Sequence, residues 1–397
     1  MSNTLTKLHI RNFRSLQDIS IETNPLNVLF GPNGSGKSNF LDSLWFVRDC
    51  AIRGVDIASS ERSHGIGVLW DGADEGANIS IEIETDLAIY KVDFGYSSGR
   101  IEPFVGEYLV SKERNLELIN RKIGSDQSYF YHNKMGQAIS VELREPEKLA
   151  LTRYLDFDDS SASAVEVDRM LRYIRLYLAR DADLYGLKKR GSESNYHTWL
   201  WDRAQNLWSV LRNLHDRRNF DNRYDTIIAF MQDAFPSFKD LLIEQTGPTS
   251  VYGNFVETNR RRPIQASGVS DGHLQLLTHL TALFSEGQDR ESILIFDEPE
   301  ISLHPYALAV FAKAVQVAAK DWEKQIFIAT HSPVLISQFD PVNILATEIG
   351  DDGQTNIQRV SEMETIKDLL EQYATGSLYM AEMIAPQSKQ SMVEPSL

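Results

Sequence analysis

Cysteine is almost absent from this sequence, since Cys50 is the only one among 397 residues. A single cysteine excludes a disulfide within the chain and is typical of proteins in a reducing compartment. No apolar run reaches the roughly 18 residues that a membrane-spanning helix needs. The first residues also lack the basic and then apolar pattern of a secretory signal. The sequence therefore predicts a cytoplasmic protein with no membrane partner.

Positive charge is also scarce, because the formal net charge is −16. This balance argues against a nucleic-acid-binding surface that is basic all over. Local clusters at Arg260–Arg262, at Lys188–Arg190 and at Arg212 with Arg217 and Arg218 fit either solvated surface or one basic face. DNA therefore stays open as a partner. Sustained heptads are missing as well, which excludes long coiled-coil arms.

A glycine-rich segment, Gly31 to Ser38, has the spacing of a loop that wraps a phosphate chain. Glycines let the backbone turn its N–H groups inward, while Lys37 would reach the β- and γ-phosphates and the Ser38 hydroxyl would bind Mg²⁺. The residues expected to bind ATP are Gly31, Pro32, Asn33, Gly34, Ser35, Gly36, Lys37, Ser38 and Asn39.

The context supports this interpretation. Leu26–Phe30 has the composition of a short buried strand, and a helical pattern begins at Ser38. The N-terminus of such a helix favours an anion. The sequence therefore predicts a nucleoside triphosphate site.

Two acids follow a second buried strand, Ser292–Asp297. A carboxylate at the end of a parallel strand lies beside a P-loop in such folds. We expect Asp297 to hold Mg²⁺ together with Ser38, and Glu298 to orient and polarise the attacking water. A solvated acidic turn is the alternative.

A third buried strand ends at His331. A neutral imidazole there would hydrogen-bond the γ-phosphate or the water, although a histidine at a strand end is often structural. Ser270, Asp271 and Gly272 precede another helical pattern, which is either a second anion site or a simple N-cap.

These motifs, in this order, resemble those of the ABC-type ATPases. Ile10–Ser15 and Pro25–Asn39 are similar to the branch that contains the SMC, RecF and OLD proteins, and within it to stand-alone bacterial AAA-type ATP-binding proteins. The resemblance covers roughly residues 1–50 and 260–340 and is loose between them.

What the resemblance implies is a catalytic site shared by two subunits that meet head to tail. Each ATP, with Mg²⁺, would lie between one P-loop and the signature residues Ser270, Asp271 and Gly272 of the other copy. Glu298, His331 and Lys37 would be the catalytic residues. The signature departs from the leucine–serine–glycine–glycine form of transporters. His304 stands where many relatives carry aspartate, which bears on communication between subunits through that loop. No glutamine loop can be placed in the diverged region after the P-loop.

The expected fold is α/β: a P-loop NTPase head of the ABC type with a mixed β-sheet, an antiparallel β-subdomain and a helical insertion. The expected division is 1–143 for an N-terminal ATPase lobe, 144–236 for the helical lobe, 237–385 for a C-terminal ATPase lobe and 386–397 for a flexible tail. Alternation in Ala77–Glu84 and Ala88–Phe94 predicts the antiparallel strands, and helical spacing in Val165–Tyr177 typifies the insertion.

The insertion also carries Trp199, Trp201 and Trp208, which we expect in a core. The leading function is an ATPase that forms a homodimer or higher homo-oligomer and regulates or powers a separate effector, a nuclease or toxin, in antiviral defence. No clustered acids of a nuclease follow His331, so we expect no cleavage by this chain. The alternative is a RecF-like, ATP-gated DNA clamp in repair. A transporter nucleotide-binding subunit is a third candidate, disfavoured by the signature.

Overall fold

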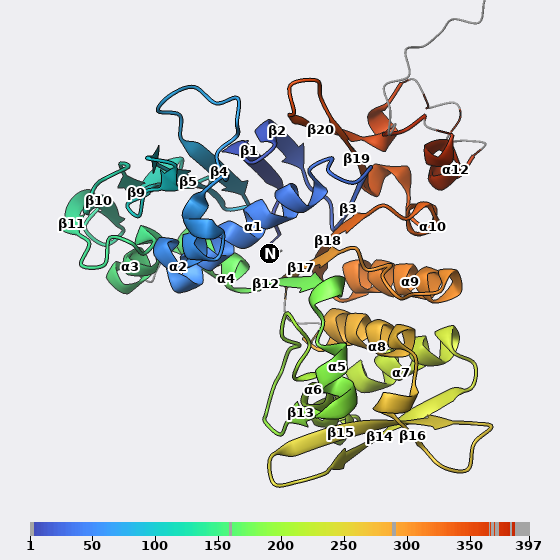
Figure 1. Ribbon diagram of the computed structural model, residues 1–397. Helices are drawn as coiled ribbons and strands as arrows, with labels where there is room; N and C mark the ends of the chain where they lie inside the picture. The colour runs from blue at the N-terminus through green and yellow to red at the C-terminus, as the bar shows by residue number, and fades with distance from the viewer. Residues whose placement is uncertain are drawn as a thin grey trace, which may run out of the picture.

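A computed structural model of the chain describes residues 4–158, 161–287, 291–364, 366, 369, 373–381 and 383–385. The expected tail, 386–397, lies outside these residues. Two sheets lie side by side in the upper part of Figure 1, and a lobe of helices and short strands hangs below them.

A six-stranded sheet forms the centre of the molecule, in the order β12-β17-β18-β3-β19-β20. All neighbouring pairs are parallel except β19 with β20. The strands are β3 (Leu26–Phe30), β12 (Ile174–Leu178), β17 (Ser292–Asp297), β18 (Lys324–Thr330), β19 (Ile344–Ile349) and β20 (Thr355–Arg359). Every residue of β3, β17 and β18 is buried. Such strands are apolar on both sides because both faces of a parallel sheet are covered.

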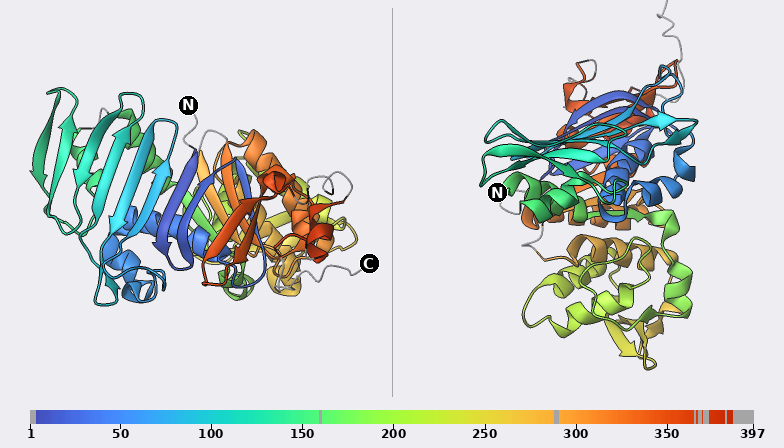
Figure 2. Two further views of the ribbon diagram at one scale, coloured as in Figure 1. Left: turned by 90° about the horizontal axis from the view of Figure 1, so that it is seen from above. Right: turned by 90° about the vertical axis from the view of Figure 1, so that its left-hand side faces the viewer.

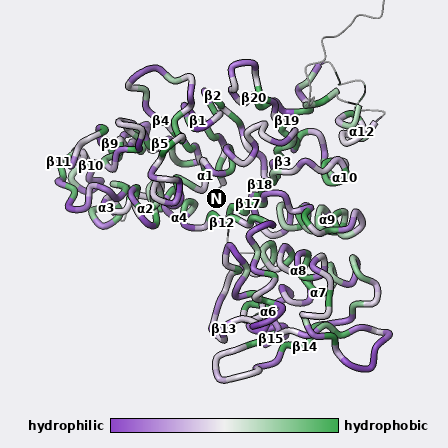
Figure 3. The backbone as a smooth tube through the Cα atoms, viewed as in Figure 1, coloured by the Kyte–Doolittle hydropathy of each residue, from purple (hydrophilic) through white to green (hydrophobic). Residues whose placement is uncertain are grey.

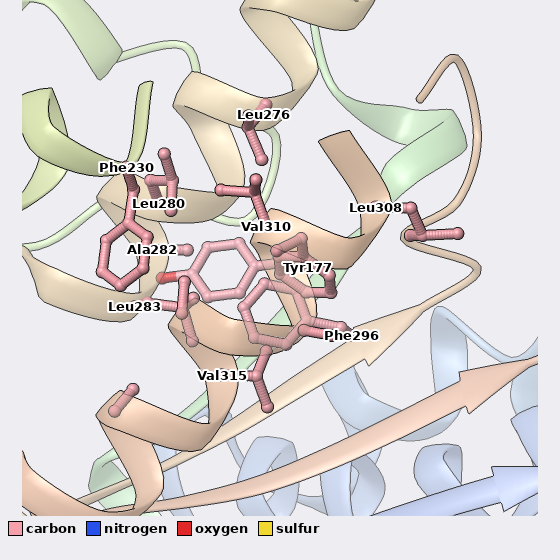
Figure 4. Packing of buried hydrophobic residues seen from close by; sticks show 14 of the residues in the cluster. Tyr177, Phe230, Leu276, Leu280, Ala282, Leu283, Phe296, Leu308, Val310 and Val315 are labelled. Atoms are coloured by element: carbon pink, nitrogen blue, oxygen red, sulfur yellow. The ribbon is translucent and has the colours of Figure 1, made fainter. Parts of the chain in front are cut away.

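The two faces of this sheet belong to two hydrophobic cores. Phe30 and Phe296 pack into the core formed with α8 (Asp271–Phe284), α9 (Pro305–Asp321), α10 (Pro333–Ile336) and α12 (Thr375–Met380). Figure 4 shows Phe296 and Tyr177 stacked among the leucines and valines of α8 and α9. Leu29 and Phe327 face the opposite core, which contains α1 (Lys37–Arg53) and α4 (Ala162–Arg172).

An eight-stranded antiparallel sheet, in the order β11-β10-β9-β8-β5-β4-β1-β2, extends from this second core. Figure 2 shows it from above as a broad, twisted layer with helices beneath it. Its strands are β1 (Lys7–Phe13), β2 (Leu16–Glu22), β4 (Ile79–Glu84), β5 (Ala88–Phe94), β8 (Gly106–Ser111), β9 (Leu116–Arg121), β10 (Gln127–His132) and β11 (Gln137–Glu142). The short strands β6 (Tyr96–Ser97) and β7 (Arg100–Ile101) pair separately, and α2 (Val55–Ser60) and α3 (Ala150–Phe157) lie nearby. Buried and less buried residues alternate along β4 and β5, as expected where only one face meets a core.

The lower lobe combines α5 (Leu184–Lys189), α6 (Leu207–Asp216) and α7 (Arg223–Ala234) with a small sheet. That sheet contains β13 (Ser192–Glu193), β14 (Phe238–Gln245), β15 (Ser250–Glu257) and β16 (Ile264–Gln265). Trp208 is fully buried against this sheet, and a Cβ on Gly253 would come within 2.1 Å of its ring. The hydropathy tube in Figure 3 shows apolar segments where α8 lies beside α9 and polar segments in the outer loops.

Part of the helical interpretation is wrong. The helix expected over Val165–Tyr177 ends at Arg172, and Ile174–Leu178 form β12, paired in parallel with β17. The apolar spacing of this segment fits both a helix and a strand, and the segment forms a strand because it pairs with β17. Of the three tryptophans expected in a core, Trp208 is buried but Trp199 and Trp201 are 40% and 39% exposed. Cys50 is buried within α1.

Candidate functional site

The P-loop connects the end of β3 at Phe30 to the start of α1 at Lys37. Gly36 has a φ of 95°, and a Cβ there would approach the Thr355 hydroxyl to 2.0 Å. A Cβ on Gly31 would approach the Thr347 carbonyl oxygen to 2.1 Å. These two positions need glycine because the loop packs tightly against β19 and β20. Gly36 offers no side-chain cap to α1, so the helix presents its first backbone N–H groups to the loop.

The Lys37 side chain folds back over this loop. The residue is only 6% exposed, and its Nζ donates to the carbonyl oxygens of Gly31 at 2.9 Å and Pro32 at 2.8 Å. Burial lowers the pKa of Lys37, and the nearby carboxylates of Asp297 and Glu298 oppose that effect. The ammonium group is thus held at the loop and faces acids on the neighbouring strand.

Ser38 and Asp297 meet across α1 and β17, where the Ser38 hydroxyl donates to Asp297 Oδ2 at 2.9 Å. The other carboxylate oxygen, Oδ1, is buried and has no hydrogen-bond partner among the described residues. Burial raises the pKa of Asp297, and the bond from Ser38 opposes it. A buried carboxylate oxygen without a donor beside a hydroxyl is the oxygen-ligand pair that Mg²⁺ accepts. In the described residues no cluster of three or more His, Cys, Asp or Glu forms a complete metal cage. The pair therefore fits an ion that takes its other ligands from phosphate and water.

Glu298 and His331 lie at the ends of neighbouring strands β17 and β18. The Glu298 backbone has a φ of 52°, unusual for a residue with a side chain, and its N–H donates to the Ala329 carbonyl at 2.8 Å. The turn leaves the Glu298 side chain 31% exposed, 3.7 Å from Nδ1 of His331. The His331 ring is itself 46% exposed.

Glu300 organises the same corner, although the sequence reasoning did not select it. One of its carboxylate oxygens, Oε1, accepts from the Thr330 hydroxyl at 2.7 Å and from the His331 backbone N–H at 3.0 Å. The same oxygen lies 3.3 Å from His331 Nδ1. The sequence does contain a signal for this residue, because Glu300 is the second acid of Glu298-Pro-Glu300. Its role becomes visible only when β18 is known to pair with β17.

The signature residues lie elsewhere, at the N-terminus of α8. Ser270 does not cap the helix backbone; its hydroxyl instead pairs with His273 Nδ1 at 2.8 Å. The carboxylate of Asp271 accepts from Lys188 at 2.6 Å. A Cβ on Gly272 would approach the Ser302 carbonyl oxygen to 2.6 Å. In the part of the chain that the structure describes, no hydrogen bond or ion pair joins these three residues to the P-loop.

A cleft of about 500 Å³ opens beside Ser38 and Asp297. Its charged walls were not foreseen: Arg180 and Asp181 follow the end of β12, and Arg14 bonds Asp42 at 2.7 Å. Arg180 acts electrostatically to lower the pKa of Asp297. Site residues gather at the carboxyl ends of parallel strands. Arg180 and Asp181 were not selected from the sequence because the strand before them, β12, was interpreted as helix.

A family model described as "AAA domain, putative AbiEii toxin, Type IV TA system" matches residues 26–337. Endonuclease GajA of Bacillus cereus (strain VD045) is 22% identical over 359 residues, covering 86% of this chain and 57% of its own length. Old nuclease of Escherichia phage P2 is 20% identical, covering 93% of this chain and 63% of its own length. The chain thus spans less than two thirds of these relatives.

A shorter match links residues of this chain to the DNA replication and repair protein RecF of Limosilactobacillus reuteri (strain DSM 20016), 30% identical over 95 residues, 24% of this chain and 23% of that protein. An SMC head bound to the C-terminal winged-helix domain of ScpA superposes with a TM-score of 0.52 at 15% identity, over 89% of this chain and 97% of that one. The α/β head fold predicted from sequence is confirmed. Among the described residues no helix has both the length and the hydropathy needed to cross a bilayer.

Proposed function

Since the chain belongs to the AAA-domain family described as putative AbiEii toxins of type IV toxin–antitoxin systems, we propose that it is a Mg²⁺-dependent ATPase that dimerises around ATP. We propose further that it regulates or powers a separate effector, a nuclease or toxin, in bacterial defence against phage or mobile DNA. It is related to GajA and Old nuclease, which are named as nucleases.

The pair formed by Ser38 and Asp297 is the observation that carries the proposal. The hydroxyl-to-carboxylate distance of 2.9 Å, with the second oxygen buried and without a donor in the described residues, leaves ligand capacity beside the P-loop. Ser38 and Asp297 would hold Mg²⁺, which neutralises phosphate charge during transfer. Lys37 would exchange its bonds to the loop carbonyls for the β- and γ-phosphates.

Glu298 is the proposed base for the attacking water. Its left-handed backbone turns the carboxylate away from the buried strand, and the exposed fraction of 31% leaves it reachable by water. His331 is the proposed γ-phosphate sensor, oriented by Glu300. Glu298 and His331 lie within 4 Å of each other. The proposed base and the proposed sensor can therefore act on the same water and phosphate, as proton removal over a short distance requires.

The dimer is proposed because the signature residues do not serve the P-loop of their own chain. Ser270 and Asp271 are exposed and Gly272 is half-buried at the start of α8, where backbone N–H groups favour an anion. A second copy would place them over the γ-phosphate of the nucleotide. ATP would then hold the dimer together, and hydrolysis would remove the charge that holds it.

The test is the Glu298→Gln variant with saturating ATP and Mg²⁺, followed by light scattering. We expect it to bind ATP, hydrolyse it at a small fraction of the wild-type rate and accumulate as a dimer. Lys37→Ala is the matched control, because it should bind no nucleotide and stay monomeric. A monomeric, ATP-saturated Glu298→Gln variant would refute the composite site.

A RecF-like, ATP-gated DNA clamp is the second candidate, favoured by the 95-residue match to RecF. It predicts salt-sensitive DNA binding only with ATP. Changing Arg260, Arg261 and Arg262 together to Glu should then abolish that binding, because phosphate contacts dominate such affinities. DNA binding that is absent, or that survives this change, favours the effector regulator.

A further inference from the structure

Two tryptophans of the lower lobe are left in solvent on a rigid loop. Trp199 and Trp201 are 40% and 39% exposed, while Leu200 between them is fully buried. Large aromatic side chains dominate the energetics of binding surfaces, and exposing two of them together is costly unless a ligand covers them.

The loop is anchored by its backbone and not by the indoles. The buried amide of Asn206 donates to the Trp199 carbonyl at 3.0 Å and accepts from the Trp201 N–H at 2.9 Å. The Tyr177 hydroxyl donates to the Leu200 carbonyl at 3.0 Å. These bonds hold the backbone that carries both indoles before any ligand arrives, so binding would cost little backbone ordering entropy.

Arginines lie over two of the indoles in this part of the molecule. The Arg175 guanidinium lies 5.1 Å from the centre of the Trp199 ring, and that of Arg48 lies 4.1 Å from the centre of Trp45. Together with neighbouring residues they line a cavity of about 200 Å³, here called the tryptophan–arginine pocket. Its lining is Trp45, Arg48, Arg53, Arg175, Leu176, Tyr177, Trp199, Leu200, Trp201 and Asp202. Three arginines and one aspartate lie in this lining, and each arginine also pairs with an acid outside it.

The ion pairs of Arg48 and Arg175 do not use every N–H donor of their guanidinium groups. Arg48 uses Nη1 for Asp49 at 2.8 Å, and Arg175 uses Nη2 for Glu286 at 3.0 Å. The Nε atoms of both arginines are buried without a hydrogen-bond partner in the described residues. Arg53 is the reachable cation of the pocket: it is 40% exposed and pairs at 2.6 Å with Glu61, itself 46% exposed, so a phosphate would compete with Glu61 for its guanidinium.

We propose that the tryptophan–arginine pocket binds single-stranded nucleic acid, with bases stacked on Trp199 and Trp201 and the backbone phosphate beside the arginines. Aromatic planes interleaved with cations are the chemistry that tracks a strand without reading its sequence. A duplex hides its base faces in the stack and would lose this contact.

The pocket adjoins the cleft beside Ser38 and Asp297. Trp45 and Leu176 line both cavities. A strand bound there would therefore lie next to the proposed nucleotide site, although its binding needs no hydrolysis and is tested without nucleotide.

The experiment measures the fluorescence anisotropy of a labelled single-stranded oligonucleotide of about 20 nucleotides, a length that spans more than one stacking site. The full chain is used in low salt without ATP. Trp199→Ala with Trp201→Ala should weaken binding by at least roughly fivefold to 150-fold, the range for one lost stacked base, because two stacking faces are removed. Tyr129→Ala with Phe220→Ala is the matched control, because these exposed rings lie outside the pocket, and it should leave affinity unchanged.

Two further variants keep the test decisive if the alanine variant folds poorly. Trp199→Phe with Trp201→Phe retains ring faces and should keep most of the affinity. Arg53→Glu should weaken binding and flatten the dependence of affinity on salt, because Arg53 is 40% exposed at the pocket.

Four results would overturn the proposal: no oligonucleotide binding, equal affinity of the tryptophan and control variants, equal competition by a duplex, or complete competition by AMP at the same phosphate concentration. AMP competition would assign the pocket to a free nucleotide. A tryptophan variant that changes only the oligomeric state in light scattering would assign the surface to a protein contact.

Discussion

Glu300 holds a corner of the candidate site through a single carboxylate oxygen. That oxygen meets the Thr330 hydroxyl, the His331 backbone and the His331 ring. Substitution of a residue that orients a reactive side chain in this way commonly lowers activity by about tenfold or more. Glu300 itself touches no proposed ligand, so we regard it as a positioning residue for His331.

Replacing Glu300 by glutamine should separate positioning from folding. Glutamine keeps an acceptor for the Thr330 hydroxyl but loses the charge that faces the imidazole. We expect kcat for ATP to fall by about tenfold with little change in KM. Steady-state kinetics measures the two parameters. Glu362→Gln, at a side chain 70% exposed outside the site, is the control. A rise in KM with unchanged kcat would contradict the positioning role.

His279 makes stability depend on pH. It is buried on α8, donates from Nε2 to the Pro299 carbonyl at 3.2 Å, and burial lowers its pKa to about 4. In the unfolded chain the pKa would be near the usual value of about 6.5. Between these values the unfolded state binds more protons, so the free energy of unfolding falls as pH falls from about 6.5 towards about 4.

The corresponding test is urea unfolding at about pH 7 and about pH 5.5. The wild type should lose about 1 kcal/mol more than His279→Gln over this range, because glutamine cannot take up the proton. His64→Gln, at an exposed ring, should behave as the wild type does. An equal loss in the wild type and His279→Gln would show that another group titrates.

At the scale of elements, α8 is joined to the loop after β17 at two points. Gly272 packs against the Ser302 carbonyl, and His279 forms a hydrogen bond with the carbonyl of Pro299, nearer the start of the same loop. Ser302 has a φ of 66°, so the loop contains a second left-handed residue after Glu298. Because this loop begins at Glu298, a shift of α8 would be felt at the proposed catalytic base.

Gly272→Ala should disturb this contact. A Cβ would lie 2.6 Å from a backbone oxygen that belongs to a constrained turn. We expect a loss of about 1–3 kcal/mol in the free energy of unfolding and a fall in hydrolysis, with ATP affinity retained. Gly247→Ala is the control, because a Cβ there meets nothing within 4 Å. Equal stability and activity of the two variants would rule out the contact.

Most elements that carry the proposed site were predictable from sequence, because β3, β17 and β18 are continuous apolar strands that end in chemically distinctive residues. Strand β12 was not, since Ile174–Leu178 continues the helical spacing of α4 and only its pairing with β17 reveals a strand. Arg180 and Asp181 were therefore missed together with it. The exposure of Trp199 and Trp201 was missed because Asn206 anchors the loop, a contact that no periodicity encodes.

At the scale of the whole molecule, the composite site makes a prediction for mixtures. Lys37→Ala disables the P-loop and Ser270→Arg blocks the surface offered to the partner, so each variant alone should be inactive. A mixed dimer would contain one site with an intact P-loop and an intact signature. At equal concentrations, up to about half of the wild-type ATPase rate should return, because only the mixed pair closes around ATP and each mixed dimer has one of two complete sites.

Coupled phosphate release measures this return. Lys37→Ala mixed with Glu298→Gln is the control, because each P-loop half is then defective and no complete site forms. If the first mixture also stays inactive while exchange of subunits is verified, the two sites are not shared in this way. Activity of Ser270→Arg alone would show that each chain catalyses by itself.

The position of β3 in the central sheet has a consequence for folding during translation. Leu26 pairs with Ile326, and Val28 pairs with Ile344, so the strand that leads into the P-loop has partners only from the far end of the chain. Pairings of such sequence separation form slowly, and a ribosome adds only about 5–20 residues each second. The antiparallel sheet can assemble early, whereas the phosphate cradle must wait for translation to pass β19. A nascent chain therefore spends many seconds with β3 unpaired, and the arrival of β18 and β19 times the first moment at which it can hold ATP.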